Sequence, residues 1–295
     1  IRASMVSWIL RHTVKRRMAT FDDPADVRQQ GAMPGAKPPI DVSVEPVQAA
    51  GVAAEWVIPR GAAADAALLY LHGGGYVFGG LDSHRGIAWR MAKASGLQVL
   101  LIDYRLAPEH PYPAAIEDAT EAYRWLLEQG YAGERIIVAG DSAGGGLAAA
   151  LMVNARTLGL PLPNAAVLMS PWADLAMTGP SMQTCAKEDA MLSPQAIGKF
   201  ASLYLQDADP RSPLASPVFA DLTGLPPTYV LVGSKEVLRS DAETLVERLQ
   251  QAGGQAQLSV WPNMPHVFPV LAGIIPEGKQ AIADMGDFIR SHLDR

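Results

Sequence analysis

Residues 135–146 read Arg-Ile-Ile-Val-Ala-Gly-Asp-Ser-Ala-Gly-Gly-Gly, and an alanine-rich stretch follows them. The apolar run predicts a buried strand, and the alanine-rich stretch predicts a helix. Between the two, residues 140–144 form a G-x-S-x-G motif at a strand-to-helix junction, the context in which this motif holds a nucleophilic serine on a sharp turn. Side chains at the two flanking positions would collide in so tight a turn, which explains Gly140 and Gly144. We therefore expect Ser142 to be a nucleophile rather than part of a plain glycine-rich turn.

A second glycine-rich loop follows the apolar run Ala67–Leu71, where residues 72–76 read His-Gly-Gly-Gly-Tyr. Consecutive glycines leave backbone N–H groups uncovered, and acyl transfer needs such donors because its tetrahedral intermediate carries negative charge on the former carbonyl oxygen. A nucleotide-binding loop is disfavoured, since residues 73–80 fail the G-x-G-x-x-G pattern at Phe78 and lack the lysine of a phosphate-binding loop. We expect His72 to order this loop rather than to titrate in a reaction.

A serine nucleophile needs a general base, which in strand–turn–helix hydrolases comes last in the chain. His266 meets this requirement, because it lies in the loop just after the last predicted strand. His292 is a poorer candidate, since it lies near the C-terminus on a predicted helix rich in polar residues.

The acid that orients this base is expected on the loop after the strand Thr228–Val232, where two carboxylates are available. Asp241 lies where the next helix begins, and a helix cap or a partner for the helix dipole explains it there. Glu236 lies earlier, in the loop itself. Both residue types are ionised at neutral pH, so geometry must choose between them. We predict Glu236 as the acid and keep Asp241 as the alternative.

The rest of the chain alternates short β-branched runs with helical stretches. The predicted strands are Asp41–Val47, Glu55–Pro59, Ala67–Leu71, Gln98–Asp103, Arg135–Ala139, Ala165–Met169, Thr228–Val232 and Gln257–Trp261. The predicted helices are His84–Ala94, Ala114–Gln129, Gly145–Leu158, Ser240–Ala252 and Lys279–His292. Continuously apolar strands that alternate with helices predict an α/β fold, with a mostly parallel eight-stranded sheet flanked by helices. The short polar link between the first two strands predicts an antiparallel hairpin at one edge.

Two segments do not fit this alternation. Residues 1–40 are predicted to form one amphipathic helix followed by a connector that contains Pro34, Pro38 and Pro39. Residues 175–215 form a long excursion with a helix around Pro194–Leu205, and such excursions are usually lids or binding loops. We assign residues 1–44 and 175–215 to a helical cap, and residues 45–174 and 216–295 to the catalytic core. In the cap, Trp8 and Ile9 are expected to help roof a pocket.

Composition excludes several classes of function. The 295 residues are 49% hydrophobic and 18% charged, with a formal net charge of -6, so the chain is an ordinary globular protein and nucleic acid is not an expected partner. Cys185 is the only cysteine, and the six histidines are scattered, so no metal site is expected.

The sequence also bears on location. No apolar run approaches the roughly 20 residues that a membrane helix needs. The basic residues Arg11–Arg17 follow the apolar stretch Met5–Leu10, which is the reverse of the order in a signal peptide. We therefore expect a cytoplasmic protein without an integral membrane segment.

Four motifs in this order give the chain a close resemblance to the hormone-sensitive-lipase-like group of bacterial esterases and lipases. They are His72–Gly75, Asp103–Pro113, Gly140–Gly145 and Pro265–His266. The resemblance implies an α/β-hydrolase fold with a cap, and an oxyanion hole built from the N–H groups of Gly74, Gly75 and Ala143. It also implies hydrolysis of short- to medium-chain acyl esters without a cofactor, and a homodimer formed through the last strand, as in many members.

The chain departs from this group at one position, because the acid is usually aspartate and the matching residue here is Glu236. The motif Asp103–Pro113 is interpreted as structural, with Arg105 paired to a nearby acid such as Glu109 or Asp118.

The sequence thus predicts a serine carboxylesterase that acts on small-molecule esters through an acyl-enzyme on Ser142. An amide or peptide hydrolase with the same three residues is the main alternative. A non-catalytic ligand receptor on the same scaffold is disfavoured, because all three catalytic positions are occupied.

Overall fold

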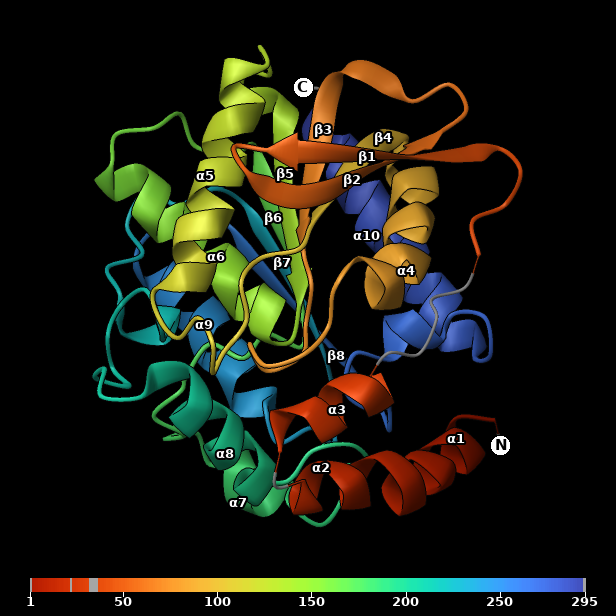
Figure 1. The fold of residues 1–295 in the computed structure, drawn as a ribbon, viewed down its shortest axis with the longest axis vertical. Helices are drawn as coiled ribbons and strands as arrows, with labels where there is room; N and C mark the ends of the chain where they lie inside the picture. Colours follow the sequence, from red (N-terminus) through yellow and green to blue (C-terminus); the bar gives the residue numbers. More distant parts are fainter. Residues whose placement is uncertain (1, 22, 32–36, 294–295) are drawn as a thin grey trace.

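The computed structural model describes residues 2–21, 23–31 and 37–293. Within them, eight strands form one sheet in the order β1-β2-β4-β3-β5-β6-β7-β8 (Figure 1). The strands are β1 (Val42–Ala49), β2 (Val52–Pro59), β3 (Ala63–Leu71), β4 (Leu97–Ile102), β5 (Ile136–Asp141), β6 (Ala165–Met169), β7 (Thr228–Gly233) and β8 (Ala256–Trp261). Strands β3 to β8 run parallel, whereas β2 is antiparallel to both β1 and β4. The predicted fold class and the predicted edge hairpin are therefore confirmed.

Helices cover both faces of this sheet (Figure 1). On one face lie α4 (Leu81–Ser95) and α10 (Pro276–Leu293); on the other lie α5 (Ala114–Glu128), α6 (Ala143–Thr157) and α9 (Arg239–Gln251). Residues 66–71 of β3, all of them buried, show why this part of the strand is apolar. Leu69 and Leu71 join the core under α5 and α6, whereas Leu68 and Tyr70 join the core under α4 and α10. A strand covered on both faces must bury every side chain.

The excursion after β6 carries two helices, α7 (Ser181–Thr184) and α8 (Pro194–Leu205), and a short 3₁₀ turn, η3 (Pro217–Phe219). Helix α8 has the bounds that the sequence predicted, and its start has a clear local cause. The Ser193 hydroxyl accepts the N–H of Ala196, and Pro194 occupies the first helical position. Two more 3₁₀ turns, η2 (Gly133–Arg135) and η4 (Phe268–Leu271), precede β5 and follow β8.

The N-terminal segment is more broken than the sequence predicted. Helix α1 (Arg2–Leu10) continues through a π-helical turn, η1 (Arg11–Lys15), into α2 (Arg16–Thr20), and a separate helix α3 (Pro24–Gly31) follows. The expectation of one helix is wrong because Asp23 and Pro24 start a second one. The Asp23 side chain accepts the N–H of Ala25, and proline suits the first helical turn. Pro34 of the expected connector lies outside the described residues.

The N-terminal helices lie beside α7 and α8 at one end of the molecule (Figure 1). Lys15 Nζ donates to the carbonyls of Ala186 and Asp189, each at 2.7 Å. The rings of Phe21 and Phe200 stack with centroids 5.1 Å apart. Trp8, by contrast, is 63% exposed, and its place over a pocket stays a prediction; the buried aromatic residue of this segment is Phe21. The division into cap and core stays a prediction.

The turn between β5 and α6 is tight. Ser142 has φ 54° and ψ −121°, an unfavourable backbone conformation for a residue with a side chain. A Cβ atom on Gly140 would lie 2.3 Å from the carbonyl oxygen of Gly144, and one on Gly144 would lie 2.1 Å from the carbonyl oxygen of Leu71. The collision expected from the motif is therefore real, and at Gly144 it involves a neighbouring strand as well.

This contact predicts opposite effects for two glycine-to-alanine changes within helices. Gly144→Ala should lower the free energy of unfolding by about 3 kcal/mol or more, because its methyl group meets rigid backbone. In α8, a Cβ on Gly198 would meet nothing closer than Met177 Sδ at 3.8 Å. Gly198→Ala should therefore stabilise the protein by up to about 1 kcal/mol through helix propensity. Thermal unfolding of both variants checks the pair, and equal shifts in Tm would contradict the argument.

Candidate active site

Four polar side chains meet at the carboxyl edge of the sheet, each just beyond a different parallel strand. Ser142 follows β5, Ser170 follows β6, Glu236 follows β7 and His266 follows β8. Because neighbouring parallel strands end at the same edge, residues more than 120 positions apart become neighbours.

The structure brings three of the predicted residues into one chain of hydrogen bonds. His266 Nε2 lies 2.9 Å from Ser142 Oγ, and His266 Nδ1 lies 2.6 Å from Glu236 Oε2. His266 is 4% exposed and Glu236 is fully buried. With Nδ1 donating to the carboxylate, Nε2 is left to accept the serine proton. His292 instead lies on α10, where its ring bonds the carbonyl of Phe288.

Ser170 was not predicted from the sequence. Its hydroxyl donates to Glu236 Oε1 at 2.8 Å and accepts the N–H of Val267 at 3.2 Å. The N–H of Gly233 also donates to Glu236 Oε1. Ser170 therefore fixes the Glu236 carboxylate relative to the loop that carries His266. The sequence carried one signal for it, because it directly follows a predicted strand whose end faces this edge.

The surroundings of His266 set its proton affinity. Burial disfavours the imidazolium, but the charge of Glu236 and its hydrogen bond outweigh that effect, so the pKa of His266 lies above its ordinary value. The carboxylate thus makes the imidazole a stronger base than a free histidine.

The loop of three glycines enters from the end of β3. His72 is fully buried, donates from Nδ1 to the carbonyl of Gly73 at 2.7 Å, and stacks on Tyr104 with ring centroids 4.1 Å apart. Burial lowers the pKa of His72 to about 3, so this ring is neutral at physiological pH. These contacts agree with a role in ordering the loop. Among the described residues, no acceptor takes the three N–H groups that the resemblance singled out, which belong to Gly74, Gly75 and Ala143.

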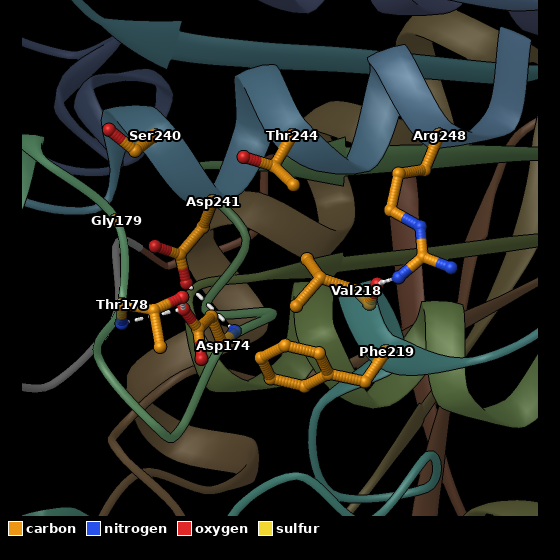
Figure 2. A pocket seen from close by; sticks show the side chains of 9 residues that line it. All are labelled: Asp174, Thr178, Gly179, Val218, Phe219, Ser240, Asp241, Thr244 and Arg248. Carbon is orange, nitrogen blue, oxygen red and sulfur yellow. Dashed lines mark hydrogen bonds between the residues drawn. The ribbon is translucent and has the colours of Figure 1, made fainter. Parts of the chain in front are cut away.

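Asp241, the alternative acid, is placed elsewhere. Figure 2 shows its carboxylate pointing from α9 toward the loop that carries Asp174. Its Oδ2 accepts the N–H groups of Ala173 and Asp174 at 3.0 and 2.9 Å. Burial, with the nearby charge of Asp174, raises the pKa of Asp241 well above its ordinary range. Asp241 therefore holds the start of the excursion against α9, rather than capping its own helix as the sequence suggested.

A small cavity of about 80 Å³ lies beside Asp241 (Figure 2). Its lining consists of Asp174, Thr178, Gly179, Val218, Phe219, Ser240, Asp241, Thr244 and Arg248. None of these residues belongs to the chain of hydrogen bonds on Ser142, so this cavity is separate from the candidate active site.

The motif Asp103–Pro113 has a structural role that the structure now specifies. Arg105 Nη2 lies 2.8 Å from Asp118, whereas Glu109 pairs with Arg28 of helix α3. Of the two acids that the sequence offered to Arg105, the structure selects Asp118. Glu109 instead ties the N-terminal segment to the core.

In the part of the chain that the structure describes, no group of three or more histidine, cysteine or acidic side chains is placed to hold a metal ion, and no helix has the length and apolarity to span a bilayer. Strand β8 pairs only with β7 and forms one edge of the sheet. A dimer through this edge stays a prediction, as does a cytoplasmic location.

Known proteins similar in sequence to this chain include hydrolases and esterases. Residues 68–270 match the family described as the alpha/beta hydrolase fold. An acetyl-hydrolase of Streptomyces hygroscopicus is 48% identical over 239 residues, which are 81% of this chain and 79% of the relative. An esterase of Acinetobacter venetianus is 39% identical over 251 residues, which are 85% of this chain and 82% of the relative.

Solved structures agree over nearly the whole length. A crystal structure of an esterase/lipase from an uncultured bacterium superposes with a TM-score of 0.96 at 43% identity, covering 100% of this chain and 99% of the other. An esterase from the bacterial hormone-sensitive lipase family superposes with a TM-score of 0.93 at 45% identity, covering 99% and 98%. The chain therefore belongs to the alpha/beta-hydrolase family and, within it, to the hormone-sensitive-lipase-like bacterial esterases, which are carboxylic ester hydrolases.

Proposed function

We propose that this esterase hydrolyses short- to medium-chain acyl esters through an acyl-enzyme on Ser142. The observation that carries the proposal is the hydrogen-bonded chain from Ser142 through His266 to Glu236. Relatives named acetyl-hydrolase and ethyl acetate hydrolase support small acyl groups as substrates.

The mechanism follows from the roles that these atoms can take. His266 Nε2 removes the Ser142 proton while Oγ attacks the ester carbonyl, and Glu236 stabilises the imidazolium that forms. The N–H groups of Gly74, Gly75 and Ala143 bind the oxyanion, and each such donor typically contributes roughly 3–4 kcal/mol to lowering the barrier. His266 then protonates the leaving alcohol, and water repeats the sequence to release the acid.

The two segments at residues 1–44 and 175–215 are proposed as the cap that limits acyl length. Their support is the aromatic cluster that joins them above the glycine loop. Phe200 of α8 stacks on Phe21 and approaches Phe78 of the loop with ring centroids 5.8 Å apart. We propose that these aromatic side chains bound the site and so limit the length of the acyl chain.

An ester series tests the proposed function. Activity on p-nitrophenyl esters should be greatest at about four to six acyl carbons and should fall sharply for long chains; an anilide of the same acid should be cleaved far more slowly. Ser142→Ala should lose up to about 10⁶-fold in kcat while keeping its fold, because the variant lacks the hydroxyl that forms the acyl-enzyme. An organophosphonate should label Ser142 alone, as checked by peptide mass spectrometry. Labelling of another serine, or substantial turnover by the variant, would remove the proposal.

The choice of acid predicts different behaviour for two carboxylate variants. Glu236→Gln should lose about 10⁴-fold in kcat, because the amide no longer stabilises the imidazolium or its tautomer. Asp241→Asn should keep kcat close to wild type, since it contacts the backbone of residues 173 and 174 rather than His266. Steady-state kinetics with a Tm for each variant decides the matter. If Asp241→Asn is inactive and Glu236→Gln is active, the acid that orients His266 is Asp241 and not Glu236.

The pKa of His266 predicts the acidic limb of activity. A raised pKa keeps the imidazolium protonated to higher pH, so kcat/KM should fall on acidification with a midpoint above the ordinary value of about 6.5. Glu236→Gln removes the negative charge of Glu236, which raises the pKa of His266, and leaves the ring buried. The midpoint of the residual activity should therefore move to lower pH. The pH profiles of both proteins provide the check, and coinciding midpoints would contradict the assigned cause.

A further inference from the structure

A buried carboxylate next to the nucleophile has no part in the mechanism above. Asp141 directly precedes Ser142 and is 3% exposed. Its Oδ1 accepts the Tyr70 hydroxyl at 2.8 Å and the N–H of Gly73 at 3.1 Å, and its Oδ2 lies 3.5 Å from His84 Nε2. Tyr70 lies on β3, Gly73 in the loop after it and His84 on α4, so groups from three segments of the chain contact this one side chain.

The contact with Gly73 is unusually close. A Cβ atom on Gly73 would lie 2.2 Å from Asp141 Oδ2 and 2.9 Å from the carbonyl oxygen of Asp141. No side chain fits between the loop and the carboxylate, so the backbone of Gly73 rests directly on Asp141. Since Gly74 and Gly75 follow Gly73, this contact joins the loop of oxyanion donors to the residue that precedes the nucleophile.

Among the described residues, the other hydrogen bonds of the loop do not reach the turn that carries Ser142, although Gly144 also packs against the carbonyls of Leu71 and His72. Tyr104 Oη donates to the carbonyl of His72 at 2.7 Å, which anchors the start of the loop to the end of β4. The N–H groups of Val77 and Phe78 both donate to the carbonyl of Gly74, which folds the loop on itself. The side chain of Asp141 thus adds a hydrogen bond to the backbone packing between the loop and the turn that carries Ser142.

The electrostatic setting suits a strong hydrogen bond. Burial disfavours the carboxylate, but the nearby His84 ring and the hydrogen bond from Tyr70 outweigh burial and lower the pKa of Asp141 below its ordinary value. An ionised acceptor makes a stronger bond to a backbone N–H than a neutral one.

We propose that Asp141 is a positioning residue that aims the N–H groups of Gly74 and Gly75 at the oxyanion by holding Gly73 in register with Ser142. This inference rests on the proposed oxyanion hole. Misplaced donors weaken binding of the transition state more than binding of the substrate, so the effect belongs on kcat rather than KM.

The test compares Asp141→Ala with the wild-type enzyme on p-nitrophenyl butyrate. We expect kcat to fall about 10²-fold, the loss that a misplacement of about 1 Å can produce, with little change in KM. A trifluoromethyl ketone forms a hemiketal oxyanion with an active serine, so its inhibition constant should weaken by the same factor as kcat/KM. Asp141→Asn keeps an oxygen that can accept from Gly73 and should restore most of kcat.

Tyr70→Phe is the matched control, because it removes the other hydrogen bond to Asp141 Oδ1 without touching the loop. It should lower Tm and leave kcat unchanged. If Asp141→Ala does not fold, Asp141→Ser replaces it; its short hydroxyl does not reach Gly73, so the same loss in kcat is expected.

Two results separate the possible failures. If the phosphonate does not label Ser142 in the wild-type protein, the proposed function itself is contradicted. Normal labelling of the wild type, with a lower Tm but unchanged kcat and ketone affinity in Asp141→Ala, would make Asp141 merely structural and overturn this inference alone.

Discussion

Two glycine-rich segments, the turn at Ser142 and the loop after β3, contact each other directly, and the arrangement of the site follows from this contact. The turn at Ser142 and the loop after β3 meet backbone to backbone, with no side chain between Gly144 and the carbonyl of Leu71. This contact brings Ser142 and the glycine loop together at one edge of the sheet. It exists only because β3 and β5 are neighbouring parallel strands that end at the same level.

The buried pair of Glu236 and His266 is the second constraint. Two ionisable groups removed from water are costly to bury unless their remaining atoms are also hydrogen-bonded. Here the second carboxylate oxygen is satisfied by Ser170 and by the N–H of Gly233. The pair is therefore fixed before a substrate arrives, and electrostatic stabilisation by fixed groups needs no reorganisation during the reaction.

The sequence was informative wherever chemistry requires a particular residue at a particular place. Ser142, His266 and the glycine loop were predicted because their motifs follow strand ends in a fixed order. Glu236 could be preferred but not established, because the two carboxylates differ in position and hardly in acidity. Ser170 and the contact of Asp141 with Gly73 were missed, because a hydroxyl or a carboxylate at a strand end is too common to identify its partner.

Local sterics and periodicity along the chain were enough to predict the order and apolar character of the strands, the tight turn at Ser142 and the class of chemistry. The folded structure was needed to identify which acid faces His266, which acid pairs with Arg105, and how the N-terminal helices contact α8. Those outcomes depend on distances between segments far apart in the chain. Such distances are set by strand order and packing, which no local pattern of residues encodes.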